Sequence, residues 1–230
     1  MTESVDLTPE RVPDLVGDAD GVLELTLRGP DAADVVVWNP DGSRAELSGN
    51  GTRIAAAWLA ARGGARSVRL TLGPREVVVR TLPDGSVEQE LGEVTVGPRE
   101  IVDGIAFVPV DVGNPHAVVE GNPDEIVRIG PALERHERFP ARTNVQVAQV
   151  ESAGHVRARV WERGVGETQA SGTSAVAVAA ATHGDGDVTV HFPGGDLRVR
   201  LAGGRAWLTG PPATLVDEDS PNRHTPEPAA

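Results

Sequence analysis

Short runs of β-branched and apolar residues recur along the chain, and Gly, Pro and Asp separate one run from the next. This pattern predicts many short strands in twisted sheets, joined by tight turns. The runs expected to be strands span residues 22–28, 35–38, 68–72, 76–81, 86–91, 105–111, 117–120, 144–151, 155–161, 188–192, 197–201 and 206–208. Residues 83–85 and 193–195 read Pro-Asp-Gly and Pro-Gly-Gly, which is typical of hairpin turns.

Two stretches differ from this background because they are rich in Ala and contain no turn residue. They span residues 54–61 and 175–182, and each is apolar nearly all round, so we expect two buried central helices wrapped by sheet. A shorter helix is predicted over residues 123–135. Residues 217–230 are polar and offer little to bury, which predicts disorder.

The two Ala-rich stretches open in the same way. The chain reads SGNGT from Ser48 and SGTS from Ser171, which lies 123 positions later, and a Gly-containing acidic turn precedes each opening. Such a repeat predicts an internal duplication of about 100 residues per half. We therefore expect an α+β fold of two pseudo-symmetric domains, at residues 1–104 and 105–212, followed by a tail at 213–230. Each domain would be a mixed or antiparallel, barrel-like sheet around one helix.

The repeated helix openings are candidate anion sites. A helix N-terminus presents unpaired backbone N–H groups and a partial positive charge, and an adjacent Gly lets a ligand approach the main chain. Two such ends facing one carboxylate would stabilise the charge that forms when an adjacent α-proton leaves. The simpler alternative is that each Ser only caps its helix. The repetition of Ser-Gly before two apolar helices favours the functional interpretation.

Composition excludes several other classes. The net charge of -13 and a pI near 4.8 disfavour a nucleic-acid partner. No apolar run approaches the roughly 18 residues that span a bilayer, and the polar start of the sequence lacks a signal-peptide pattern, so we expect a cytoplasmic protein without membrane partners. The six His residues show no ligand spacing, so no metal site is expected.

The residue types that are missing limit the chemistry further. The chain has no Cys, which excludes a thiol nucleophile, and every basic residue other than His is Arg. Without Lys, no internal aldimine with pyridoxal phosphate can form. Chemistry at an amino-acid α-carbon would therefore need no such cofactor, and we expect none.

The helix openings resemble the two cysteine-containing signatures of diaminopimelate epimerases, Cys-Gly-Asn-Gly-Ala-Arg and Ala-Cys-Gly-Thr or Ala-Cys-Gly-Ser. Here they read SGNGTR from Ser48 and ASGTSA from Ala170. Supporting matches across residues 7–216 read GDADGVLEL, WNPDGSRAE, VGNPHAVV, GPALERHERFPARTNVQVAQV, WERGVGETQA and FPGGDL. The Arg-Gly-x-Gly-Glu-Thr and Gly-Asn-Pro-His runs are specific enough to identify the chain as similar to this family.

The resemblance implies a role for each matching residue. It places Ser48 and Ser171 where the family has its two catalytic bases, with His116 and Glu162 beside the reacting centre. It also implies substrate-binding residues, namely Asn39, Gly49, Asn50, Asn114, Asn144, Arg163, Gly172 and Thr173. Among these, the backbone N–H groups of the two helix openings would hold the α-carboxylate, and Arg163 would pair with the distal carboxylate, which suits a bidentate guanidinium. Taken singly, Asn39 and Asn114 could be ordinary turn residues. His116 could be a strand residue whose ring nitrogens simply have hydrogen-bond partners.

The sequence departs from the family in two places. A Ser hydroxyl stays protonated where a thiol can become a thiolate, so proton transfer needs a separate base such as Glu162 or His116. The family's opening strand, with its Gly-Asn-Asp-Phe segment, has no match. Either the given sequence starts inside a longer protein, or part of the pocket is lost.

Three functions remain open. The first is cofactor-independent interconversion of LL- and meso-diaminopimelate in lysine and cell-wall biosynthesis, by a protein that the family suggests is a homodimer. The second is an isomerase, racemase or dehydratase with Ser-based chemistry on another amino or hydroxy acid. The third is a catalytically impaired homologue that only binds its ligand.

Overall fold

A computed structural model describes residues 7–17, 19, 21–45 and 49–211, with only the backbone of residues 49 and 50. The helices are η1 (Pro9–Arg11), α1 (Val12–Val16), α2 (Gly49–Gly63), η2 (Pro123–Glu125), α3 (Ile126–Glu134) and α4 (Gly172–Thr182). The strands are β1 (Val22–Leu27), β2 (Ala32–Trp38), β3 (Arg44–Ala45), β4 (Ser67–Leu72), β5 (Arg75–Thr81), β6 (Val87–Glu93), β7 (Thr95–Val96), β8 (Glu100–Val102), β9 (Ile105–Asp111), β10 (Pro115–Glu120), β11 (Asn144–Ser152), β12 (His155–Glu162), β13 (Gly166–Thr168), β14 (Gly186–Phe192), β15 (Gly195–Ala202) and β16 (Arg205–Gly210).

All of the predicted strands and helices are present, with ends that differ by a few residues. The predicted turns at residues 83–85 and 193–195 join β5 to β6 and β14 to β15, which pair as antiparallel hairpins. The sequence pattern missed η1 and α1 and the short strands β3, β7, β8 and β13. The predicted tail at residues 213–230 lies outside the described residues.

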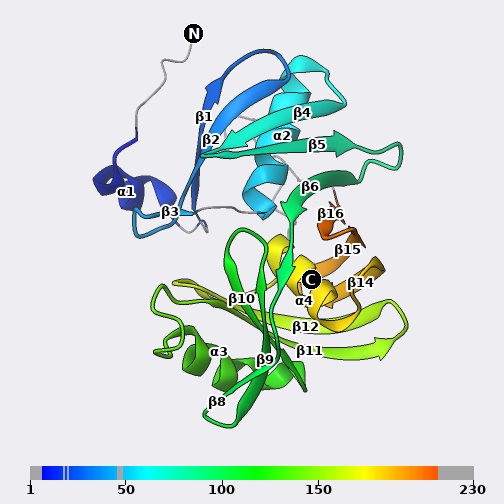
Figure 1. Ribbon diagram of the computed structural model, residues 1–230. Coiled ribbons are helices and arrows are strands. Elements are labelled where there is room, and N and C mark those ends of the chain that lie inside the picture. Colours follow the sequence, from blue (N-terminus) through cyan, green and yellow to red (C-terminus); the bar gives the residue numbers. More distant parts are fainter. Residues whose placement is uncertain (1–6, 18, 20, 46–48, 212–230) are drawn as a thin grey trace, which may run out of the picture.

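The sheet shows the duplication directly. Its strands run in the order β1-β2-β4-β5-β6-β16-β15-β14-β12-β11-β10-β9-β7. In the first half, β2 runs parallel to β4 with α2 crossing between them, and in the second half β12 runs parallel to β14 with α4 crossing between them. An antiparallel pair, β6 with β16, joins the halves, and Figure 1 shows it between them. The pseudo-symmetric α+β fold is thus confirmed. Because the sheet is continuous, the proposed division between residues 104 and 105 stays a prediction.

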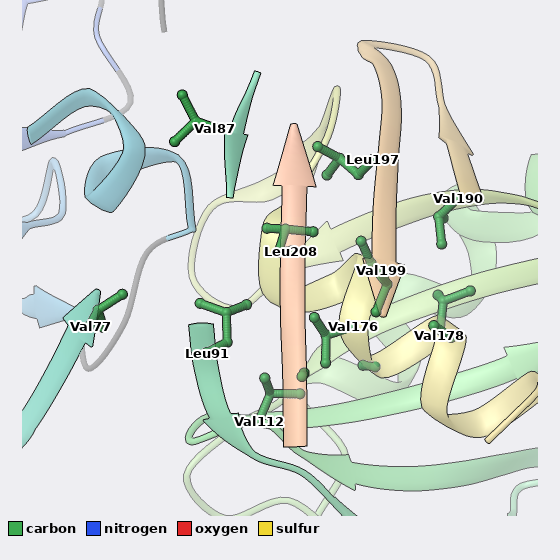
Figure 2. Packing of buried hydrophobic residues seen from close by; sticks show 14 of the residues in the cluster. Val77, Val87, Leu91, Val112, Val176, Val178, Val190, Leu197, Val199 and Leu208 are labelled. Carbon is green, nitrogen blue, oxygen red and sulfur yellow. The ribbon is translucent and has the colours of Figure 1, made fainter. Parts of the chain in front are cut away.

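Helix α4 lies at the centre of the second half. Its residues from Gly172 to Ala179 are buried. Val176 and Val178 belong to the same core cluster as Leu197, Val199 and Leu208 of β15 and β16 (Figure 2). A second, smaller cluster packs α3 against strands β9 to β11. The first turn of α4 is therefore held in a fixed position by the core behind it.

Helix α2 is less buried than predicted. Ile54 and Trp58 are 42% and 37% exposed, whereas Ala177, which lies 123 positions after Ile54, is fully buried in α4. The reason is that β9 and β10 contact α4, and within the described residues no pair of strands takes the same place beside α2. The prediction of two fully buried helices is thus right for α4 and wrong for this face of α2.

Candidate active site

Ser171 stands at the N-cap position of α4, but its side chain does not cap the helix. Its backbone is extended, with φ -144° and ψ 128°, and no side-chain cap hydrogen bond forms. The hydroxyl instead donates to Oε2 of Glu162 at 3.4 Å, and Ser171 is only 6% exposed. The simple capping interpretation does not describe this serine, because its hydroxyl is directed toward a carboxylate.

Glu162 is held from two sides at the end of β12. Its Oε1 accepts a hydrogen bond from Oγ1 of Thr168 at 2.5 Å, and its Oε2 accepts the bond from Ser171. Thr168 is in place because β13 pairs with β12, with Glu162 opposite Gly166. The carboxylate is therefore oriented next to the start of α4.

The first turn of α4 presents backbone N–H groups beside this pair. The helix ladder begins with the N–H of Ala175 bonding the carbonyl of Ser171, so the preceding N–H groups have no partner within the helix. These N–H groups belong to Gly172, Thr173 and Ser174, and all three residues are buried. A carboxylate at this point would meet N–H donors and the positive end of the helix dipole.

His116 lies beneath the same helix turn in a buried chain of polar groups. Its Nε2 is 2.9 Å from Oδ1 of Asn114, its Nδ1 is 3.0 Å from Nε2 of Gln146, and that amide also donates to Oγ of Ser174 at 2.9 Å. The consistent assignment is a neutral ring that accepts from Gln146 and donates to Asn114. Burial, together with the nearby positive charge of Arg163, lowers the pKa of His116 to about 3. The neutral ring ties β10 and β11 to α4.

Asn144 uses both ends of its amide on the backbone. Its Nδ2 donates to the carbonyl of Pro115 at 3.0 Å, and its Oδ1 accepts from the N–H of Arg163 at 3.0 Å. The side chain is 5% exposed. In this arrangement Asn144 positions the turn that carries Arg163.

Glu134, at the end of α3, holds the other side of that turn. Its Oε1 accepts from the N–H of Gly164 at 2.8 Å and its Oε2 accepts from the indole of Trp161 at 3.1 Å, and the residue is 2% exposed. The half-buried Arg163 places Nη1 3.5 Å from the carbonyl of Ala141. The guanidinium is thus carried on a turn that is fixed by Glu134 and Asn144.

Three of these supporting residues were not predicted from the sequence pattern, namely Gln146, Glu134 and Thr168. Gln146 could have been suspected, because it alternates with Val in a strand and lies two residues from Asn144, on the same face. Glu134 and Thr168 give no comparable signal, since their roles come from tertiary contacts.

The first half presents a different set of groups. The amide of Asn39 donates to Oγ of Ser43 at 2.9 Å, and the N–H and hydroxyl of Ser43 donate to Asp41 at 2.9 and 2.6 Å. These bonds lower the pKa of Asp41. Ser48 lies outside the described residues. Helices α2 and α4 contact each other.

The structure thus brings together most of the predicted site in the second half. Ser171 contacts Glu162 directly, Asn144 holds Arg163, and the network from Asn114 through His116 reaches the first turn of α4. Across the described ranges, no cluster of three or more His, Asp or Glu residues could hold a metal ion. No helix in the same ranges is long and apolar enough to span a membrane.

Comparisons with known proteins point to one family. The model of the diaminopimelate epimerase family matches residues 108–215. A diaminopimelate epimerase from Xanthomonas campestris is 37% identical over 84% of this chain and 79% of its own length. One from Azotobacter vinelandii is 39% identical over 79% of this chain and 75% of its own length.

Solved structures show the same fold. A protein described as a predicted epimerase from Pseudomonas aeruginosa superposes with a TM-score of 0.69 at 16% identity, covering 88% of this chain and 83% of its own. A hydroxyproline epimerase from Agrobacterium vitis gives a TM-score of 0.63 at 17% identity, covering 92% and 82%. At these identities the likeness concerns the fold alone.

Proposed function

The chain belongs to the diaminopimelate epimerase family, and on that premise we propose that it interconverts LL- and meso-diaminopimelate by removing and returning one α-hydrogen. The observation that carries the proposal is the contact of the Ser171 hydroxyl with Glu162 at the buried start of α4. It combines an anion site with an oriented carboxylate in one place. Because the sequence has no Lys, the reaction proceeds without an internal aldimine.

The α-carboxylate of the substrate binds at the first turn of α4. There the N–H groups of Gly172 and Thr173 stabilise the negative charge that spreads onto the carboxylate as the α-hydrogen leaves. By pseudo-symmetry, Gly49 and Asn50 at the start of α2 provide the second set of donors. The helix dipoles act where the charge develops, which lowers the barrier to proton removal.

Proton transfer on the second-half face needs a base other than serine, because a hydroxyl stays protonated near neutral pH. Ser171 is placed to pass its hydroxyl proton to Glu162 while its oxygen takes the proton from the α-carbon. Thr168 orients the carboxylate for this transfer. His116 is neutral and buried, so its role is to position Ser174 and the helix start through Gln146.

The distal end of the substrate lies toward Arg163. A guanidinium pairs well with a carboxylate in bidentate geometry, and the turn that carries it is fixed by Asn144 and Glu134. Asn39 and Asn114 complete the polar lining. Because both ends of its amide already bond the backbone, Asn144 acts by holding Arg163.

The test is to incubate the protein with LL-diaminopimelate in heavy water and to measure deuterium at the α-carbon and formation of the meso isomer. Incorporation above background is expected. If none occurs and a panel of hydroxyprolines reacts instead, the protein is an isomerase of another substrate. Thermal stabilisation by diaminopimelate without exchange would identify a binding protein that has lost catalysis.

We also propose that the protein works in the cytoplasm as a homodimer, in lysine and cell-wall biosynthesis. Support comes from membership of a family named for diaminopimelate. Light scattering of the purified protein would measure the subunit number, and twice the chain mass of 24.0 kDa is expected.

A further inference from the structure

One contact between the two halves reaches the loop that carries Asn114. Nη1 of Arg75, at the start of β5, donates to the carbonyl of Val112 at 3.2 Å. Strand β5 belongs to the first half, whereas Val112 lies in the loop between β9 and β10 of the second half (Figure 1). Arg75 is half-buried and Val112 is fully buried, so water competes little for this bond. The guanidinium therefore bonds the main chain across the boundary between the halves.

The guanidinium also lies against the backbone of Gly113. A Cβ built on Gly113 would be 2.0 Å from Cζ and Nη1 of Arg75 and 2.1 Å from its Nη2, so the guanidinium fills the space where a side chain would stand. Gly113 has a φ of +95°, which residues with a side chain rarely adopt. Glycine is thus required here both by the backbone conformation and by the close approach of Arg75.

The loop leads directly into the site. The N–H of Gly113 donates to Oδ1 of Asp111 at 2.5 Å, and the N–H of Val112 donates to the carbonyl of Asn114 at 3.2 Å. Oδ1 of Asn114 is 2.9 Å from Nε2 of His116. These bonds shape the loop from within the second half. The guanidinium bond comes from the other half, so it fixes the loop relative to that half.

Arg75 stands at the end of the first-half sheet from which Asn39 follows. It pairs with Leu72 across the turn between β4 and β5, and β4 runs parallel to β2. The end of β4 therefore lies at the same edge of the sheet as the end of β2, which is Trp38. Arg75 thus links the edge that carries Asn39 in one half with the loop that carries Asn114 in the other.

We propose that Arg75 is a positioning residue, which holds the loop between β9 and β10 against the first half and so sets where Asn114 and His116 stand in the site. This inference rests on the proposed action on diaminopimelate. A guanidinium is planar, always charged and has five N–H donors, so it can bond a carbonyl and cover a glycine at the same time. A displacement of about 1 Å in a site can cost about 100-fold in rate. A loosened loop should therefore slow the reaction although every group of the site is still present.

The first experiment removes the guanidinium and keeps the length of the side chain. Arg75→Met should slow the exchange of the α-hydrogen of LL-diaminopimelate in heavy water by about 10- to 100-fold. Arg75→Lys should restore part of the rate, because an ammonium group can still donate to the carbonyl. Arg80→Met is the matched control. Arg80 lies in the same strand, and its side chain is 60% exposed in a surface ion pair with Glu88, so the rate should not change.

A double-mutant cycle tests the same contact from the other side. In Gly113→Ala the new Cβ displaces the guanidinium, so this variant should be slowed about as much as Arg75→Met. Because both changes break one contact, the double variant should be within about two-fold of the slower single variant. Gly104→Ala controls for backbone strain, since Gly104 has a φ of +78° and nothing within 4 Å of an added Cβ. Two losses that multiply in the double variant would overturn the proposal.

Amide hydrogen exchange gives a second measurement that does not depend on turnover. In Arg75→Met the amides of Val112 and Gly113 should exchange faster by about 10-fold or more, as expected for the loss of a hydrogen bond from a charged group. Amides of β14 and β15 should keep their wild-type rates. Faster exchange there as well would show a general loss of stability and would overturn the proposal.

The two measurements together also separate this proposal from the proposed function. A slower reaction with an unchanged loop would mean that Arg75 binds the substrate directly, and an unchanged reaction with an unchanged loop would mean that the contact has no effect. Either result would overturn the positioning role. If the wild-type protein acts on neither isomer of diaminopimelate but the loop loses protection in Arg75→Met, the proposed function fails and the positioning of the loop stands.

Discussion

Glu134 offers the sharpest test of how the Arg163 turn is held. In Glu134→Ala, the N–H of Gly164 and the indole N–H of Trp161 lose their acceptor. Each unsatisfied, partly buried donor costs about 1–3 kcal/mol. The ion pairs of Glu134 with Arg135 and Arg142, at 3.7 and 3.6 Å, add little because the two Arg side chains are 71% and 53% exposed. The expected loss in unfolding free energy is about 3 kcal/mol.

For a chain of this size, about 3 kcal/mol corresponds to a fall of about 6–12 °C in Tm, which calorimetry would measure. Glu134→Gln keeps one acceptor oxygen and should lose less. Glu137→Ala, three positions later and exposed, is the control and should change the unfolding free energy by less than about 0.5 kcal/mol. A Glu134→Ala variant as stable as this control would refute the reasoning. Because the turn loosens, KM for diaminopimelate should rise more than kcat falls.

Three further predictions concern His116, Gly130 and the two helix-start serines. The folded pKa of His116, about 3, is below its ordinary 6.5, so between these values only the unfolded chain binds the proton. The unfolding free energy should therefore fall, by at most about 1.4 kcal/mol per pH unit, as pH drops from 6.5 toward 3 in denaturant titrations, and His116→Gln should flatten that fall. Gly130→Ala would place a Cβ 2.7 Å from the β12 tryptophan and should cost about 1–3 kcal/mol in thermal unfolding, whereas Gly121→Ala, with its nearest contact at 3.8 Å, should be tolerated. The Ser48→Cys, Ser171→Cys double variant should speed epimerisation by supplying thiolates on both faces, and an inert double variant would show that the pocket lacks more than thiols.

The strands were predictable because short runs of apolar and β-branched residues, separated by turn residues, depend directly on the local structure. The missed strands β3, β7, β8 and β13 have only two or three residues and form through pairing with longer neighbours. Helix α1 has five residues, too few for a periodic pattern. The exposure of α2 depends on which strands cover it, so its apolar sequence could not distinguish it from α4.

At the site, the repeated Ser-Gly openings and the family resemblance were sufficient to place Ser171 with Glu162 and the start of α4. The residues that support them were less visible. Thr168 reaches Glu162 because of the register between β12 and β13. Glu134, in α3, accepts a hydrogen bond from Gly164, which lies 30 positions later in the sequence. Such contacts between elements leave no local mark in the sequence.

The most direct measurement compares the wild-type protein with Glu162→Gln in heavy water containing LL- or meso-diaminopimelate. Deuterium at the α-carbon is followed by mass spectrometry. The wild type should incorporate deuterium at the α-carbon, and Glu162→Gln should be slower by about 100-fold or more at unchanged folding. A wild type that exchanges neither isomer, or an unchanged rate in Glu162→Gln, would contradict proton transfer at Ser171 and Glu162.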